Sequence, residues 1–178
     1  GAQAQVGVAQ RGRAAQHVAF AEQCGESAAQ FDEAKLARPQ QQLHPVPEAM
    51  SASHAAAYPA AYTTAYVSLV ERAQLQSGET LLVHGASGGV GMASVDVGHI
   101  LGATVIATTA SPEKAAALKA AGADHVIVLG PKPGESFREQ VKALTDGRGA
   151  DVIFDPVGGD IFDESTRCIA FNGRLLVI

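Results

Sequence analysis

Short apolar stretches alternate with helix-like stretches along the second half of the chain, and this alternation constrains the fold more than any other feature. The pattern predicts five strands, over residues 80–84, 104–108, 125–129, 151–155 and 174–178. Helices are predicted between them, over 89–101, 112–121, 135–145 and 160–170. Because the strands are β-branched and apolar on both faces, they are typical of a parallel sheet that helices cover on both sides. The sequence therefore predicts an α/β fold built on a doubly wound parallel sheet.

Two further segments precede this pattern. Residues 1–23 contain short alternating pieces that predict one or two brief strands, too few to form a sheet of their own. Residues 24–47 are rich in Gln, Ala and Glu and hold several prolines, which indicates a surface insertion that leads into a linker. The organised domain is expected over residues 48–178. Its first part, residues 52–72, predicts two helices, or one helix kinked at Pro59.

A glycine-dense turn, GASGGVG at residues 85–91, joins the first predicted strand to the helix after it. Its spacing, Ala86-x-Gly88-x-x-Gly91, matches the dinucleotide-binding pattern G-x-G-x-x-G except for the alanine. Gly88 has no Cβ to hold a pyrophosphate away from the backbone, and Gly91 allows the helix to pack closely. The helix N-terminus adds unpaired N–H groups and a partial positive charge. The turn therefore predicts a dinucleotide-binding site.

The residues after the second predicted strand bear on which dinucleotide binds. An NAD site places an acid about 20 positions past the turn, where it binds the ribose 2′-hydroxyl. Here Thr109 stands at that place, and Ser111 and Lys114 follow it. No acid at the strand end repels a 2′-phosphate, and a hydroxyl and a cation in the next turn can hold one, so this segment favours NADPH over NADH. In the other interpretation Ser111 only caps the next helix, ahead of Pro112, and Lys114 is solvated.

Several other positions have both a structural and a functional interpretation. His84 ends the first strand, where a packed histidine is favoured over a proton donor. Asp155 ends the fourth strand, where it either lies near the cofactor or caps the next turn, and neither interpretation is preferred. The hydroxyls of Thr63 and Thr64 can bond a cofactor or their own helix backbone, and spacing alone favours the backbone. No catalytic residue is identified.

Composition and charge exclude several classes of function. With 47% hydrophobic and 17% charged residues, the composition is that of a globular, core-forming chain. A net charge of −5 without long basic runs argues against nucleic-acid or anionic-membrane partners. No apolar run approaches the roughly 20 residues that span a bilayer. Cys24 and Cys168 form neither a metal-ligand spacing nor a disulfide framework, so a reducing, cytoplasmic location and no metal are expected.

Residues 45–178 resemble the nucleotide-binding half of the medium-chain dehydrogenase/reductase superfamily. They are most similar to its zinc-free quinone oxidoreductase (zeta-crystallin-like) branch. The segments that carry the resemblance are RAQLQSGETLLVHGASGGVG, ATVIATTASPEKAAALKAAGADHVI, GRGADVIFDPVGGDIF and GRLLVI, in the family's order and spacing. Residues 12–20 look like the last strands of the family's GroES-like substrate domain, so 1–23 is expected to be a remnant of it. The Rossmann domain at 48–178 is expected to be truncated, since the commonest nucleotide-binding sheet has about six strands.

The resemblance implies an NADPH-dependent, zinc-independent reductase of quinones or other α,β-unsaturated carbonyls, such as enones and enoyl thioesters. It also implies a homodimer. Matched by position, Thr63 would lie beside the nicotinamide. Leu129 replaces a tyrosine often found near the adenosine end, which predicts a weaker grip on the phosphate. The residues predicted to bind the cofactor are Thr63, Ala86, Ser87, Gly88, Gly89, Val90, Thr109, Ser111, Lys114 and Val157.

Two other hypotheses remain. In the first, the chain is a nucleotide-binding or structural subunit that keeps the reductase fold without turnover. The glutamine-rich segment 24–42 and the missing substrate domain motivate this hypothesis. A zinc alcohol dehydrogenase is the least favoured, because the zinc ligands of that branch cannot be placed on this chain. The sequence does not identify the substrate, whose pocket would lie between two domains.

Overall fold

The computed structural model describes residues 45–130 and 137–178. The expected GroES-like remnant, 1–23, and nearly all of the predicted insertion lie outside the described residues. The chain divides into two compact units, Gly1–Ala57 and Tyr58–Ile178. The described part of the first unit contains the beginning of helix α3 (Ala52–Tyr66), where the Ser51 hydroxyl accepts a hydrogen bond from the amide of His54 at 3.3 Å. The second unit contains the whole sheet.

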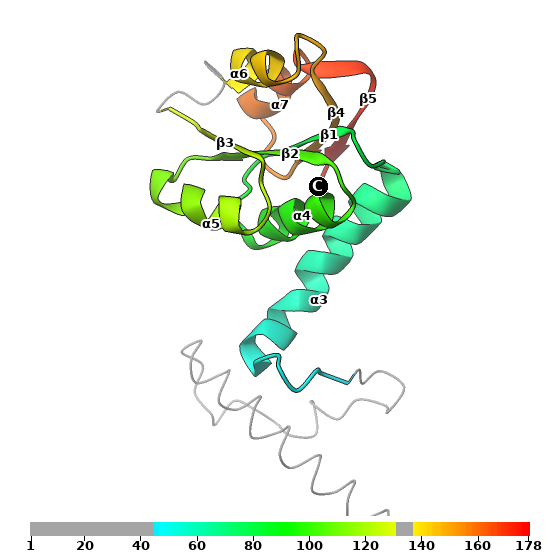
Figure 1. Ribbon diagram of the computed structural model, residues 1–178, viewed down its shortest axis with the longest axis vertical. Coiled ribbons are helices and arrows are strands. Elements are labelled where there is room, and N and C mark those ends of the chain that lie inside the picture. The colour runs from blue at the N-terminus through cyan, green and yellow to red at the C-terminus, as the bar shows by residue number, and fades with distance from the viewer. Residues whose placement is uncertain (1–44, 131–136) are drawn as a thin grey trace, which may run out of the picture. The chain divides into compact units, whose positions relative to one another are not determined.

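Five parallel strands form one sheet in the order β3-β2-β1-β4-β5 (Figure 1). Their bounds are β1 Thr80–Val83, β2 Thr104–Thr109, β3 His125–Val128, β4 Ala150–Asp155 and β5 Ile169–Val177. In the central strand β1, Leu82 pairs with Ile106 of β2 and with Ile153 of β4. The strand order reverses between β1 and β4, and in sheets of this type ligands bind outside the carboxyl ends of the strands at such a reversal. This arrangement confirms the predicted doubly wound α/β fold of the Rossmann type.

Helices cover both faces of the sheet, as the apolar strands predict. On one face lie α4 (Gly89–Ile100) and α5 (Ala115–Ala120), and on the other α6 (Phe137–Leu144) and α7 (Asp160–Ser165) (Figure 1). Alternate residues of the strands supply two separate cores, because successive side chains of a strand point to opposite faces. Leu81 and Val83 of β1 belong to the core beneath α4, and Leu82 belongs to the core beneath α6 and α7.

The long helical segment before the sheet differs in detail from its prediction. Helix α3 does not end at Pro59 but runs through it to Tyr66, so of the two predicted arrangements the structure has the single helix. The alanines around the proline are the strongest helix formers and support this continuity. The hydrogen-bond pattern changes only later, at η3 (Val67–Arg72), which is a π-helix. The Tyr62 hydroxyl of α3 donates a hydrogen bond to the carboxylate of Asp96 in α4 at 2.8 Å.

Two other predicted helices are shorter than expected. Residues 112–114 form a 3-10 turn, η4 (Pro112–Lys114), and the α-helical part begins only at α5. The prediction of a helix over 160–170 is wrong beyond residue 165. Helix α7 ends there, and β5 starts at Ile169, which pairs with Ala150 of β4. The pairing with β4 is a non-local interaction that outweighs the local helical pattern, so β5 includes residues 169–173 as well as the predicted end strand.

Arg174 joins the outer strand β5 to the segment between η3 and β1. Its Nη1 and Nη2 bind the two carboxylate oxygens of Glu79 at 2.8 and 2.7 Å, and its Nε donates to the carbonyl of Ala73 at 2.9 Å. The bond from Arg174 holds the pKa of the Glu79 carboxyl below its usual value. A bidentate guanidinium–carboxylate pair of this kind is more specific than an exposed ion pair.

We therefore expect Arg174→Ala to lower the free energy of unfolding by about 2 kcal/mol, because it removes charge-assisted hydrogen bonds in a partly buried place. Arg167 offers a matched control, since it is 60% exposed and pairs with Glu164 three residues earlier. Arg167→Ala is expected to cost less than about 0.5 kcal/mol. Urea unfolding of both variants measures the two losses, and equal losses would contradict the structural role of Arg174.

Candidate dinucleotide-binding site

The turn after β1 is hydrogen-bonded to both neighbouring strands, at the point where the strand order reverses. The amide of His84 donates to the carbonyl of Phe154 in β4 at 2.9 Å, and the amide of Ala86 donates to the carbonyl of Thr108 in β2 at 3.0 Å. Gly85 has a φ of +54°, a conformation that side chains rarely adopt. Sequence reasoning missed Gly85, because the G-x-G-x-x-G spacing directs attention to Ala86. The glycine that the turn's backbone requires therefore stands one residue earlier.

The N-terminus of α4 opens directly from this turn. Its N-cap is Gly88, with no side-chain cap, and its first turn contains no acid. The first intrahelical bond runs from the amide of Met92 to the carbonyl of Gly88 at 2.8 Å, so the amides before Met92 are donors without a partner in the helix. Gly88 and Gly89 are exposed, and a Cβ added at Gly89 would meet nothing within 4 Å. This geometry fits the pyrophosphate of a dinucleotide.

Gly91 has the packing role that its spacing predicts. A Cβ at this position would lie 2.4 Å from the carbonyl oxygen of Gly85 and 2.7 Å from the Cα of Ala86. Both atoms belong to the backbone of the turn, so they cannot move aside as a flexible side chain would. A side chain at position 91 would therefore push α4 away from the turn.

A cluster of hydroxyl groups lies where β2 ends. The Thr109 hydroxyl donates to the Ser87 hydroxyl at 3.1 Å and accepts a bond from the amide of Ser111 at 3.1 Å. Ser111 stands at the N-cap of η4, but its side chain makes no capping hydrogen bond. The interpretation that its hydroxyl only caps the helix is therefore wrong. Lys114 is exposed, and its amide donates to the carbonyl of Ser111 at 3.0 Å.

The turn after β4 lies on the other side of β1. The Asp155 carboxylate oxygen Oδ1 accepts hydrogen bonds from the amides of Val157 and Gly158, both at 2.9 Å, which confirms that Asp155 caps this turn. Val157 is 55% exposed. A Cβ added to Gly85 would lie 3.2 Å from its Cγ2, so Val157 packs against the turn that follows β1. The structure therefore brings the two predicted segments together at one edge of the sheet.

His84 is a packed, neutral histidine. Its side chain is fully buried, and its ring meets that of Phe137 edge-on at 4.9 Å. Burial lowers the pKa of His84 to about 4, an effect larger than the opposing attraction of Asp155. Nδ1 lies 3.0 Å from the Thr108 hydroxyl and Nε2 lies 2.8 Å from the Ser165 hydroxyl. Since this burial keeps both ring nitrogens from solvent, the structure supports the packed interpretation over the proton donor.

The remaining predicted positions are less closely tied to this site. Thr64 bonds back to the carbonyl of Ala60 at 2.8 Å, as its spacing favours. Thr63 is exposed on α3, and its contact with a nicotinamide stays a prediction. Leu129 is half-buried and follows β3, where its amide donates to the carbonyl of Thr109 at 2.8 Å. Leu129 therefore lies beside the hydroxyl cluster.

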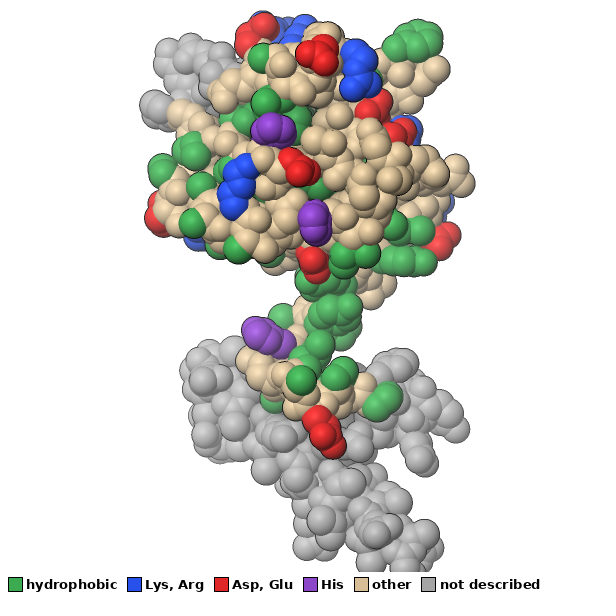
Figure 2. Space-filling model, viewed as in Figure 1, with side chains coloured by type: hydrophobic (Ala, Val, Ile, Leu, Met, Phe, Trp, Pro, Cys, Tyr) green, Lys and Arg blue, Asp and Glu red, His purple; other side chains and the backbone are tan. Residues whose placement is uncertain are grey.

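Neither charged side chains on the face shown in Figure 2 nor metal-binding side chains in the described residues form a cluster. On the face shown in Figure 2, acidic and basic side chains are interspersed over the sheet domain. Within residues 45–130 and 137–178, no group of three or more His, Cys, Asp or Glu side chains is arranged to hold a metal ion. None of the helices described is long and apolar enough to cross a membrane.

Comparisons with known proteins agree with this geometry. The family model described as zinc-binding dehydrogenase matches residues 89–178, half of the chain. A quinone oxidoreductase-like protein 2 homolog from Nematostella vectensis is 39% identical over 156 residues, which are 87% of this chain and 41% of that protein. The chain thus spans about two fifths of the length of this relative.

Two solved structures show the same fold. The apo form of JamJ enoyl reductase is 36% identical with a TM-score of 0.70, and the match covers 79% of this chain and 41% of that one. A mycobacterial protein, Rv1454c, in complex with NADPH is 33% identical with a TM-score of 0.71, covering 79% and 42%. With the family match, these likenesses show that the chain belongs to the medium-chain dehydrogenase/reductase superfamily, as part of its nucleotide-binding domain.

Proposed function

We propose that this chain is the cofactor-binding part of an oxidoreductase that reduces a quinone or another α,β-unsaturated carbonyl with NADPH, without zinc. The observation that carries the proposal is the uncapped N-terminus of α4 next to the hydroxyl cluster that ends β2. The first feature favours a pyrophosphate and the second a ribose phosphate. The names of the relatives, a quinone oxidoreductase-like protein and an enoyl reductase, support the reaction class.

The proposed binding mode follows the order of the elements along the sheet edge. The backbone of residues 86–90 binds the pyrophosphate, with amide donors from Ser87, Gly89 and Val90. The Gly88 amide already donates to the Gly85 carbonyl at 3.0 Å, so Gly88 contributes by leaving room for the ligand. Thr109 orients Ser111, whose hydroxyl binds the 2′-phosphate together with the ammonium of Lys114. Since the adenosine half lies over β2, the nicotinamide half extends past β1 toward β4, where Val157 borders it. Thr63 is assigned to the same end.

The proposed reaction is a two-electron reduction. When bound, NADPH would supply the hydride that reduces the electrophilic carbon or oxygen of the substrate. A proton from solvent completes the saturated carbonyl compound or the hydroquinone. The chain's own residues bind and orient the cofactor and exclude water beneath it. Because His84 and Asp155 are fully buried, neither is assigned the role of proton donor.

The double variant Ser111→Ala/Lys114→Ala tests the choice of cofactor. We expect its dissociation constant for NADPH to rise about 10- to 100-fold, because charge-assisted hydrogen bonds to a phosphate are removed. The dissociation constant for NADH should change less than about threefold, since NADH has no 2′-phosphate to lose contact with. Titrations that follow nicotinamide fluorescence measure both values. Lys119→Ala is the control, because Lys119 is an exposed lysine of α5 that bonds the carbonyl of Asp124.

Two outcomes of this titration would count against the assignment. Equal weakening of NADPH and NADH would show a general loss of structure, and no weakening of either would show that the phosphate binds elsewhere. Melting temperatures of the three proteins, followed by circular dichroism, separate a folding defect from a binding defect.

The reaction itself is tested on the protein of full natural length. Consumption of NADPH with a panel of quinones, enones and enoyl thioesters would support the proposal and identify the substrate class. Binding of NADPH without turnover on any of them would favour the non-catalytic subunit.

We also propose a cytoplasmic homodimer, and the outer strand β5, where Phe171 is 95% exposed, supports a protein partner. Light scattering coupled to size-exclusion chromatography tests this state.

A further inference from the structure

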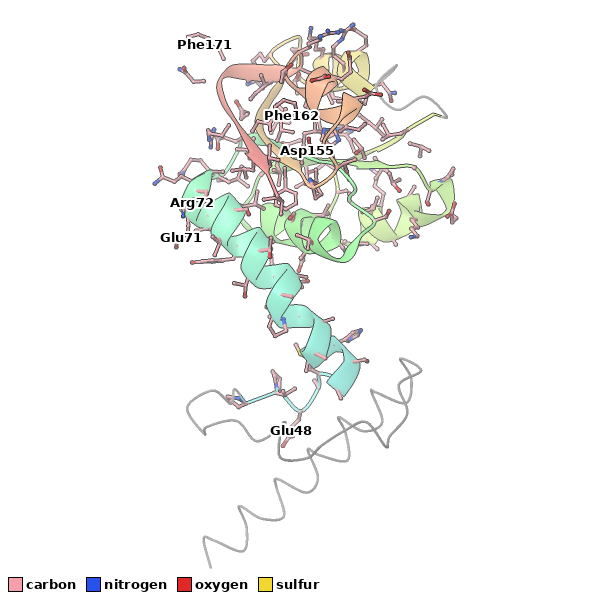
Figure 3. The ribbon with its side chains drawn as sticks, turned by 180° about the vertical axis from the view of Figure 1, so that it is seen from behind. Glu48, Glu71, Arg72, Asp155, Phe162 and Phe171 are labelled. Atoms are coloured by element: carbon pink, nitrogen blue, oxygen red, sulfur yellow. The ribbon has the colours of Figure 1, made fainter. Side chains whose placement is uncertain are left out.

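Asp155 leaves one carboxylate oxygen without a hydrogen bond in the interior of the domain. Its side chain is fully buried, and Oδ2 has no partner among the described residues. Oδ1 alone caps the turn, through the amides of Val157 and Gly158. A buried, unpaired acceptor lowers stability, and it costs more when it is charged. Figure 3 shows Asp155 within the body of the domain, in contrast to Phe171, which projects away from it.

Turn capping does not explain the choice of a carboxylate at this position. The amide oxygen of an asparagine or the hydroxyl of a serine can accept the same backbone bonds without burying a charge. The neighbouring titratable group, His84, is neutral, since burial lowers its pKa to about 4. His84 also uses both ring nitrogens on Thr108 and Ser165, so it does not bond Oδ2. The negative charge is therefore uncompensated by this neighbour.

The position of Asp155 shows which part of a bound dinucleotide would meet this charge. Asp155 is the last residue of β4, on the opposite side of β1 from the hydroxyl cluster at the end of β2. Its capped turn carries Val157 against Gly85. In the proposed binding mode the nicotinamide half lies at this end. The reduced nicotinamide ring is neutral, and the oxidised ring carries a positive charge.

We propose that Asp155 sets the preference between the two redox states of the cofactor, by placing a carboxylate with one unpaired oxygen on the nicotinamide side of the binding site. The charge favours the cationic ring of NADP⁺ over the neutral ring of NADPH. It therefore also favours departure of the hydride, which leaves NADPH as NADP⁺ while the unsaturated substrate gains the electron pair. This inference rests on the proposed function.

Asp155→Asn is the discriminating variant, because asparagine keeps an oxygen for the two amides and removes only the charge. We expect the affinity for NADP⁺ relative to NADPH to fall about tenfold, as a unit charge near a cation in a partly desolvated site predicts. The affinity for adenosine 2′,5′-bisphosphate should not change, since this ligand lacks the nicotinamide half. Isothermal titration calorimetry measures all three ligands. Asp160→Asn, which removes an exposed acid from the first turn of α7, should leave the ratio unaltered.

An unchanged ratio of NADP⁺ to NADPH affinity in Asp155→Asn, or the same change in Asp160→Asn, overturns the inference while leaving the proposed function intact. Failure of the wild-type protein to bind NADPH, NADP⁺ or the bisphosphate overturns the proposed function and the inference together. Asp155→Ser provides a second test if the asparagine variant does not fold, because the serine hydroxyl can cap the turn without a charge.

Discussion

Gly91→Ala is expected to lower the free energy of unfolding by about 3 kcal/mol, one of the largest effects of a single methyl group in this domain. The added Cβ would lie 2.4 Å from the Gly85 oxygen and 2.7 Å from the Ala86 Cα, so the turn or helix α4 must move. Gly89→Ala is the matched control on the same helix. Its Cβ meets nothing within 4 Å, and alanine is the better helix former, so stability should rise by up to about 1 kcal/mol.

Chemical denaturation of both variants at neutral pH measures this contrast. The two effects are expected to have opposite signs. This result would show that the loss at Gly91 comes from close packing of the helix on the turn, and not from a general intolerance of side chains in this segment. A loss of the same size at Gly89, or less than about 0.5 kcal/mol at Gly91, would contradict the packing that the structure describes.

Acidification is expected to remove about 3 kcal/mol of stability through His84 alone. The pKa of this imidazole is about 4 in the folded protein and about 6.5 when unfolded, because burial disfavours the charged ring. Between these values the unfolded chain binds the proton and the folded protein does not, so stability falls as pH falls. The contribution is complete above about pH 6.5 and is lost by about pH 4.

Urea unfolding of the wild type and of His84→Gln at several pH values isolates this contribution, because other titrating groups are common to both proteins. The wild type should lose about 3 kcal/mol more than the variant between neutral pH and pH 4. Parallel pH profiles would show that His84 titrates normally and would contradict its burial. Nitrogen chemical shifts of the imidazole provide a direct check of the neutral state in the folded protein.

The proton arrangement of His84 follows from the bonds around it. The Ser165 hydroxyl donates to the carbonyl of Ile161 at 2.7 Å, so it accepts from Nε2–H of His84. Nδ1 is then the acceptor for the Thr108 hydroxyl. This chain connects β1, β2 and α7. His84 is therefore a structural link beneath the dinucleotide site.

The order of strands and helices could be predicted from the sequence, because each strand is a short apolar run and local periodicity is enough to locate it. The end of α7 could not, since residues 166–170 continue a helical pattern, whereas in the structure the helix stops at 165 and residues 169 and 170 join β5. The pairing of β5 with β4 depends on contacts between Ile169 and Ala150, which are distant in sequence. Local signals carry no information about it.

Local sequence signals likewise predicted some parts of the candidate site and not others. The glycine spacing locates the turn, and the position about 20 residues beyond it locates the segment that begins at Thr109. Backbone conformation could not be read from the spacing, so the role of Gly85, with a φ of +54°, was missed. The neutral state of His84 depends on its burial, among residues as distant along the chain as Ser165, 81 residues away. The unpaired oxygen of Asp155 likewise follows from burial, which no sequence pattern reveals.

The most direct test of the account is a titration of the wild-type protein with NADPH and with NADH, followed by nicotinamide fluorescence. NADPH is expected to bind at least about tenfold more tightly, because Ser111 and Lys114 meet its 2′-phosphate and no acid stands at the end of β2 to repel it. Equal or tighter binding of NADH would contradict the assignment of the hydroxyl cluster, and with it the proposed NADPH-dependent reductase.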